Sequence, residues 1–178
     1  DPGPVKSGFC IYDVQTSKIL NFGEIPNQEL KELVIQNTDC EFAIETIVSY
    51  GMAVGKSTFE TCFYIGQLQQ ILLDNQTSYK MISRQEVKLN LCFSPRAKDA
   101  NVNQAVRDLF EPTGQNGKSE PCVKGTKKYP GPLYGFSSHS FSALAIALTY
   151  LGINSSTIAL SYEKRMEIQC QNSKIKNV

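Results

Sequence analysis

The sequence opens with the stretch DPGPVKSGFCIYD, residues 1–13. Its second half, Ser7–Asp13, is predicted to form a β-strand, with Lys18–Ile25 as its hairpin partner across a polar turn. The Asp-Pro-Gly turn before the strand places one carboxylate at the edge of a sheet, and its glycine permits close approach of a metal ion or a phosphate. The same tripeptide is also an ordinary turn, so the stretch alone leaves both interpretations open.

Beyond this hairpin, the pattern of apolar residues predicts alternating helices and strands. We expect Asn27 to cap the first helix, because its side chain is of the type that accepts from free helix N–H groups. This order favours a mixed sheet flanked by helices, an α/β architecture, and no GxGxxG motif indicates a dinucleotide fold. Helices are predicted at 27–36, 58–75, 86–92, 98–110 and 142–151, and further strands at 41–47 and 79–83.

The length of 178 residues fits one domain, residues 1–178, with a real core. Glu111–Gly135 is rich in glycine and proline, and we expect a long functional or mobile loop there. Residues 152–178 form a C-terminal extension with a basic tail. No apolar run reaches the roughly 18 residues that a membrane span needs, so we expect a soluble, cytoplasmic protein with no membrane partner.

Cysteine spacing and charge narrow the function classes. None of the six cysteines forms a CxxC-type pair, which argues against a zinc site, and we expect most of them to be reduced. Residues 1–89 carry 7 basic and 11 acidic side chains (net −4), and residues 90–178 carry 11 and 6 (net +5). This asymmetry can place an anion-binding surface beside a metal-binding cluster, or it can be ordinary solvated surface.

Two single residues stand out as candidates for chemistry. Glu45 lies near the end of an apolar predicted strand, where a carboxylate is costly to bury without a cation or a donor beside it; it could instead face solvent. His139, the only histidine, precedes an apolar helix, where a cap or surface role is the more common alternative. Residues 51–57 (GMAVGKS) look like a phosphate loop but have one residue too few between the glycines. We expect a loop there whose Lys56 meets a phosphate.

In order and spacing, these pieces together resemble the RuvC-type Holliday junction resolvases of the RNase H-like superfamily. Two of them, at 130–135 and 98–102, are also similar to a phage-borne branch. The resemblance extends from Asp1 to about Leu151. It is carried by Asp1-Pro-Gly with Ser7-Gly-Phe, by Glu45, by Arg84-Gln-Glu-Val-Lys and Ala97-Lys, and by His139-Ser-Phe-Ser-Ala-Leu-Ala-Ile-Ala.

The resemblance implies an RNase H-like mixed five-stranded sheet flanked by helices, in a homodimer that binds four-way or other branched DNA during recombination and repair. It implies an endonuclease that hydrolyses phosphodiesters with Mg²⁺, or Mn²⁺ as an alternative, in a bacterial or phage-infected cell. The implied catalytic residues and metal ligands are Asp1, Glu45 and His139, with Ser142 as a weak fourth ligand. The implied DNA contacts are Lys56, Arg84, Lys88, Lys98, Lys124, Lys127 and Lys128.

The chain departs from the family pattern at two places. Ser142 stands where the resemblance leads one to expect an aspartate, so the expected metal site has one negative charge fewer. Asp99 and Asp108 are conceivable substitutes, although helical spacing makes them surface residues. The family also has an apolar strand that leads into the Asp-Pro-Gly turn, and we expect such a strand ahead of Asp1.

Two other functions compete with the junction nuclease. Ser142 favours a catalytically weakened protein that binds junctions or other DNA on the same scaffold. An actin-like or sugar-kinase relative also has an Asp-x-Gly turn after its first strand, but that fold needs two such domains and more residues. Cleavage of a four-way junction distinguishes the nuclease from the weakened DNA-binding protein. ATP binding would favour the actin-like or sugar-kinase relative.

Overall fold

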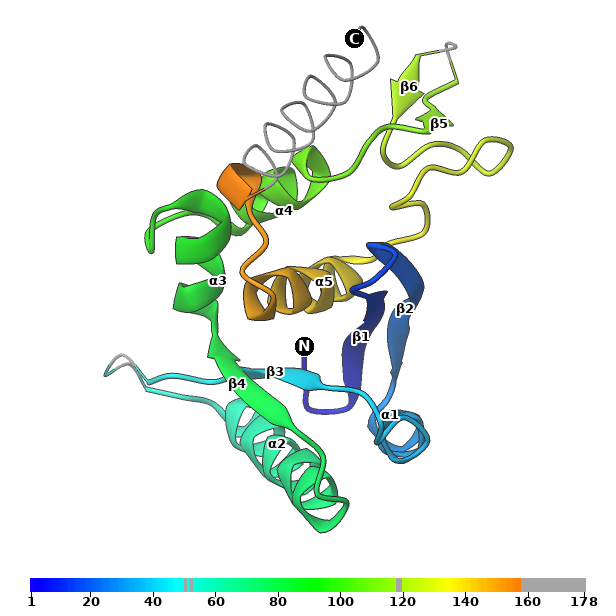
Figure 1. The fold of residues 1–178 in the computed structure, drawn as a ribbon. Coiled ribbons are helices and arrows are strands. Elements are labelled where there is room, and N and C mark those ends of the chain that lie inside the picture. The colour runs from blue at the N-terminus through cyan, green and yellow to red at the C-terminus, as the bar shows by residue number, and fades with distance from the viewer. Residues whose placement is uncertain (50, 52, 118–119, 158–178) are drawn as a thin grey trace, which may run out of the picture.

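Helices and strands alternate along the chain in the computed structural model, which describes residues 1–49, 51, 53–117 and 120–157 (Figure 1). The elements are β1 (Lys6–Asp13), β2 (Lys18–Pro26), α1 (Asn27–Ile35), β3 (Phe42–Thr46), α2 (Lys56–Asp74), β4 (Tyr79–Ser83), α3 (Arg84–Cys92), α4 (Asp99–Asp108), β5 (Gly114–Gln115), β6 (Pro121–Cys122) and α5 (Ser138–Tyr150).

Strands β1 and β2 form the predicted antiparallel hairpin, with Lys6 opposite Pro26 and a bulge between Ile11 and Tyr12. Its polar turn is closed by Asp13, whose carboxylate accepts hydrogen bonds from the Gln15 backbone and the Thr16 hydroxyl. Strands β3 and β4 are parallel, with Glu45 opposite Ile82, and α2 connects them. A helix between two parallel strands is the usual way to connect them.

Two apolar clusters fill the interior. One gathers around α5 and takes in buried residues of α3 and α4, with Leu144 fully buried at its centre. The other lies between α1, α2 and β3 and includes Leu72 and Ile44. Helix α5 is apolar around most of its circumference, as expected for a helix that packs against neighbours on several sides, and it contacts β1, β3, α3 and α4. The mixed α/β class predicted from the sequence is therefore confirmed.

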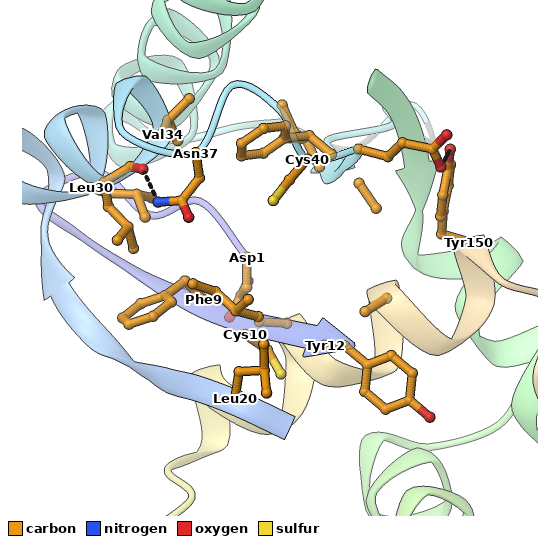
Figure 2. Close-up of a pocket in the computed structure, with 18 of the residues that line it drawn as sticks. Asp1, Phe9, Cys10, Tyr12, Leu20, Leu30, Val34, Asn37, Cys40 and Tyr150 are labelled. Atoms are coloured by element: carbon orange, nitrogen blue, oxygen red, sulfur yellow. Dashed lines mark hydrogen bonds between the residues drawn. The ribbon is translucent and has the colours of Figure 1, made fainter. Parts of the chain in front are cut away.

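The five-stranded sheet that the sequence predicts is not shown by the described strands. The described strands form three two-stranded sheets, β1–β2, β3–β4 and β5–β6, instead of one sheet of five strands. Strands β1 and β3 do not pair with each other, and the groove between them is lined by residues of both. The two pairs of strands are therefore separated by this groove (Figure 2).

The N-termini of several helices also differ from the sequence-based prediction, although α1 begins at Asn27 as predicted. Asn27 does not cap α1, because its side chain binds Ser7 and Gly3 instead. Helix α2 begins at Lys56, two residues before the predicted start at residue 58. Helix α5 begins at Ser138 because the Ser137 side chain accepts a hydrogen bond from the Ser140 N–H, which is the usual role of an N-cap serine. His139 therefore lies inside the first turn of α5, not before the helix.

The glycine-rich segment Glu111–Gly135 carries the short strands β5 and β6 and a bridge between Gly125 and Pro130, so it is not devoid of secondary structure. Cysteines 10, 40, 62, 92 and 122 are free thiols, as predicted, and Cys170 lies outside the described residues. Most of the predicted C-terminal extension, residues 158–178 with the basic tail, lies outside them too. Within the described part of the chain, no helix has both the length and the apolar character needed to cross a bilayer.

Candidate active site

Asp1 is fixed to the edge of β1 by two backbone hydrogen bonds. The Gly8 N–H donates to the Asp1 carbonyl at 2.9 Å, and the Asp1 amine donates to the Gly8 carbonyl at 3.1 Å. The Asp1 side chain is 16% exposed. The backbone thus determines where the first carboxylate lies.

A network of buried polar groups holds the turn that follows Asp1. The Ser7 hydroxyl is buried, accepts a hydrogen bond from the Gly3 N–H and donates to the Asn27 side chain at 2.7 Å. The Asn27 amide donates to the Gly3 carbonyl, and the Tyr64 hydroxyl donates to the Asn27 carbonyl at 2.9 Å. Buried polar groups that are satisfied in this way specify one arrangement, so α1 and α2 both anchor the Asp-Pro-Gly turn. Sequence reasoning missed this network, because its members are up to 61 positions apart.

His139 reaches Asp1 from the first turn of α5. Its Nδ1 lies 2.8 Å from the Asp1 Oδ2, and the imidazole is 55% exposed. When Asp1 is ionised it accepts this hydrogen bond from Nδ1, and in the neutral imidazole Nε2 then keeps a free lone pair. The approach depends on Gly8, because a Cβ at that position would lie 2.4 Å from the His139 carbonyl oxygen.

Glu45 meets this pair at the end of β3. It is half-buried and lines a cavity of about 520 Å³ together with Asp1 and His139. Ser57 and Thr58, in the first turn of α2, line the same cavity, as does Arg84 at the start of α3. Three predicted site residues from separate parts of the chain therefore line one cavity; their roles as metal ligands and catalytic residues stay a prediction.

Ser142 does not join them. It is half-buried one turn after His139 on α5 and is not among the residues that line the cavity. Within the described residues, no three His, Cys, Asp or Glu side chains are grouped closely enough to hold a metal ion on their own. The two carboxylates of Asp1 and Glu45 nevertheless suit Mg²⁺, which takes oxygen ligands and keeps several of its waters. The donor set thus fits a cation held by two carboxylates and water.

The predicted DNA contacts fall into two groups. Arg84 and Lys88 share the Asp99 carboxylate, at 2.9 and 3.7 Å. Partial burial would raise the pKa of Asp99, but the hydrogen bond and charge of Arg84, together with Lys88, lower it overall. Asp99 is exposed, as predicted, and it is the acidic partner of two predicted DNA contacts, which spacing along the sequence did not reveal.

The remaining predicted contacts are exposed. Lys56 lies in the first turn of α2 and pairs with Glu60 at 3.4 Å, a contact within one helix that contributes little. The other predicted DNA contacts, Lys98, Lys124, Lys127 and Lys128, are exposed as well.

Comparison with known proteins shows the fold. No protein-family model matches the chain, and no curated protein matches its sequence. The structure is similar to that of Thermus thermophilus RuvC in complex with a Holliday junction substrate. The identity is 17% and the TM-score 0.57, and the match covers 85% of this chain and 89% of that one. A second Thermus thermophilus RuvC structure matches at 16% identity and a TM-score of 0.56, over 85% and 90% of the two chains. The chain therefore has a RuvC-like fold.

Replacing Gly8 with alanine tests the close contact between β1 and α5. The new methyl group would lie 2.4 Å from the His139 carbonyl oxygen, so the first turn of α5 must move away from Asp1. We expect Gly8→Ala to lower the free energy of unfolding by about 1–3 kcal/mol, measured by urea denaturation.

Gly66→Ala is the matched control, since an added Cβ there, on the exposed side of α2, meets no atom within 4 Å. Alanine is favoured over glycine in a helix by about 1 kcal/mol, so the control should be neutral or stabilising. Equal effects of the two substitutions would show that the contact between β1 and α5 is not tight.

Proposed function

We propose that the protein is a structure-selective endonuclease that cuts four-way or other branched DNA by Mg²⁺-dependent hydrolysis of a phosphodiester. The observation that carries this proposal is the convergence of Asp1, Glu45 and His139 on one cavity within a RuvC-like fold. One similar structure is a complex with a Holliday junction substrate. An identity of 17% supports only the fold, so the substrate is proposed here from the fold together with the site.

Asp1 and Glu45 would hold the cation, with Mn²⁺ as an alternative to Mg²⁺. A divalent cation in such a site stabilises the charge that develops on the phosphate and lowers the pKa of a bound water. Asp1 also orients His139 through Nδ1, which leaves Nε2 free to accept a proton from water or to act as a ligand. The chain thus supplies two oxygen ligands and one oriented base in the same cavity.

The cavity is bordered by groups that suit a DNA backbone. Arg84 lines it beside the carboxylates, with Lys88 one turn further along α3, and the first turn of α2 opens onto the same space. A helix N-terminus attracts phosphate because its N–H groups are unpaired. Lys56 and the exposed lysines at 98, 124, 127 and 128 would extend this surface along the DNA.

Several further features belong to the same proposal. A four-way junction has paired arms, which suits a homodimer, because a two-fold assembly presents the same site twice. A reaction on cellular or phage DNA during recombination or repair places the protein in the cytoplasm of a bacterial or phage-infected cell. The proposed function also includes an RNase H-like sheet of five strands as its scaffold.

A second candidate function is a DNA-binding protein that has lost most of its catalysis. Two observations favour it: Ser142 contributes no carboxylate, and the described residues hold no preformed group of three metal-ligand side chains. Such a protein would bind junctions through the same basic residues without cutting them, so binding and cleavage must be measured separately.

Cleavage of a four-way junction in the presence of Mg²⁺ tests the proposed function. We expect the junction to be cut in preference to a linear duplex of the same sequence. Glu45→Gln keeps the shape of the side chain but removes a charged ligand, and should slow cleavage by roughly 10²–10³-fold. Glu29→Gln, an exposed change in α1 away from the cavity, is the matched control and should leave the rate unchanged.

Two results would contradict the proposed nuclease activity or the role of Glu45 in it. Tight junction binding without cleavage would favour the DNA-binding alternative. Cleavage that persists undiminished in Glu45→Gln would remove Glu45 from the reaction.

Adding a carboxylate at position 142 tests whether this turn of α5 faces the metal. Ser142 does not line the cavity, so a longer, charged side chain there should lower the Mg²⁺ concentration needed for half-maximal cleavage only where this turn faces the metal. Ser138→Asp adds the same charge in the first turn of the same helix and should leave that concentration unchanged. A Mg²⁺ titration of both variants decides the point. An unchanged requirement in a folded Ser142→Asp protein would show that residue 142 does not reach the metal.

A further inference from the structure

Arg84 lies at the border of the candidate site because of the register of two strands. In the parallel pair, Glu45 of β3 lies opposite Ile82 of β4, and β4 ends one residue later, at Ser83. The Ser83 and Glu86 side chains form a capping box, in which the Glu86 carboxylate accepts a hydrogen bond from the Ser83 N–H at 2.7 Å. This cap fixes the first turn of α3, so Arg84 is held at the cavity that Glu45 also lines.

The Arg84 guanidinium binds a carboxylate that does not line this cavity. Its Nε and Nη2 both donate to the same Asp99 oxygen, Oδ1, at 3.3 and 2.9 Å. The Lys88 Nζ, one helical turn further along α3, lies 3.7 Å from that oxygen, beyond the length of a good hydrogen bond. The stronger arrangement pairs two guanidinium nitrogens with two different oxygens of the anion. Asp99 therefore binds both cations, but only loosely.

The guanidinium of Arg84 is also incompletely satisfied. Its third nitrogen, Nη1, is buried and has no hydrogen-bond partner among the described residues. A buried N–H group without an acceptor costs free energy, and most such groups in proteins are paired. A phosphodiester offers several oxygens, and the planar guanidinium can bind two of them at once. A phosphate would therefore satisfy Arg84 better than the single Asp99 oxygen does.

The exposure of the three side chains identifies Asp99 as the partner that can leave. The Asp99 side chain is 66% exposed, whereas those of Arg84 and Lys88 are 27% and 23% exposed. Asp99 is the first residue of α4, and an ion pair with so exposed a partner contributes little to stability. The two cations are thus half-buried on α3, while the anion that neutralises them lies at the surface.

We propose that Asp99 takes the place of a DNA phosphate in the free protein, and that a backbone phosphate displaces it from Arg84 and Lys88 when DNA binds. A phosphodiester carries one negative charge, as the carboxylate does, so both cations stay neutralised through the exchange. Because Arg84 lines the cavity of Asp1 and Glu45, the phosphate lies beside that cavity. Asp99 thereby lowers the affinity for DNA. The exchange rests on the DNA binding that belongs to the proposed function, and not on cleavage.

Binding of a four-way junction in the absence of divalent cations tests the exchange. Asp99→Asn keeps the shape of the side chain and removes its charge, so it should lower the Kd for the junction roughly threefold to tenfold. Asp108→Asn, the matched control, removes the same charge from the exposed other end of α4. That end is roughly 14 Å away along the helix axis, beyond the screening length of about 8 Å at physiological salt, so the Kd should stay nearly unchanged.

A second background separates the exchange from a general effect of charge. In an Arg84→Gln protein the carboxylate has lost its main partner, so adding Asp99→Asn should change the Kd far less than it does when Arg84 is present. Thermal unfolding shows that each variant is folded. Weaker or unchanged binding by Asp99→Asn would overturn the proposal, because Asp99 would then only position Arg84 or join two helices. An equal gain in the Arg84→Gln background would overturn it too.

Cleavage in Mg²⁺, measured with the same proteins, keeps this outcome apart from that of the proposed function. Tighter binding by Asp99→Asn, in a protein that does not cut the junction, would support the exchange and contradict the nuclease. Cleavage by a protein whose binding Asp99→Asn does not tighten would support the nuclease and contradict the exchange. A protein that binds no junction, with or without Asp99, would contradict both.

Discussion

The reciprocal hydrogen bonds between Asp1 and Gly8 are the constraint on which the candidate site depends. They fix the first carboxylate against β1, and the missing side chain of Gly8 lets α5 come close enough for His139 to reach that carboxylate. Gly8 thus acts on both of its sides, through its backbone toward Asp1 and through its small size toward α5. The network of Ser7, Asn27 and Tyr64 then keeps the turn in place.

The sequence predicted those parts of the structure that depend on local pattern. The hairpin of β1 and β2, the strand Tyr79–Ser83 and the position of Glu45 near the end of β3 follow from alternation and turn residues, and the structure confirms them. The predicted start of α5 was wrong because the apolar run marks the buried part of the helix, whereas the helix begins with Ser138 and His139, which are polar and exposed. Asn27 has the right chemistry for a cap, but its side chain binds Ser7 and Gly3, which lie 20 and 24 positions away in the sequence.

The arrangement of charge explains how an almost neutral chain can suit a polyanion. Asp1 and Glu45 lie in a cavity that Arg84 also lines, and Arg84 and Lys88 converge on Asp99. Acidic and basic groups thus alternate over a short stretch of surface, where a cation can neutralise the carboxylates and basic side chains can face phosphates. The net charge of the whole chain does not indicate this arrangement. The difference in charge between the two halves of the sequence predicted an anion-binding surface beside a metal-binding cluster, but not which residues form them.

The location of a bound divalent cation tests the central claim most directly. Crystals of the protein soaked in Mn²⁺ would reveal the ion by its anomalous scattering, independently of any DNA or activity. The account predicts manganese between the Asp1 and Glu45 carboxylates, with oxygen ligands from both at about 2.2 Å, and its loss from crystals of Glu45→Gln. Manganese bound elsewhere, with these two carboxylates free of metal at saturating concentration, would contradict it.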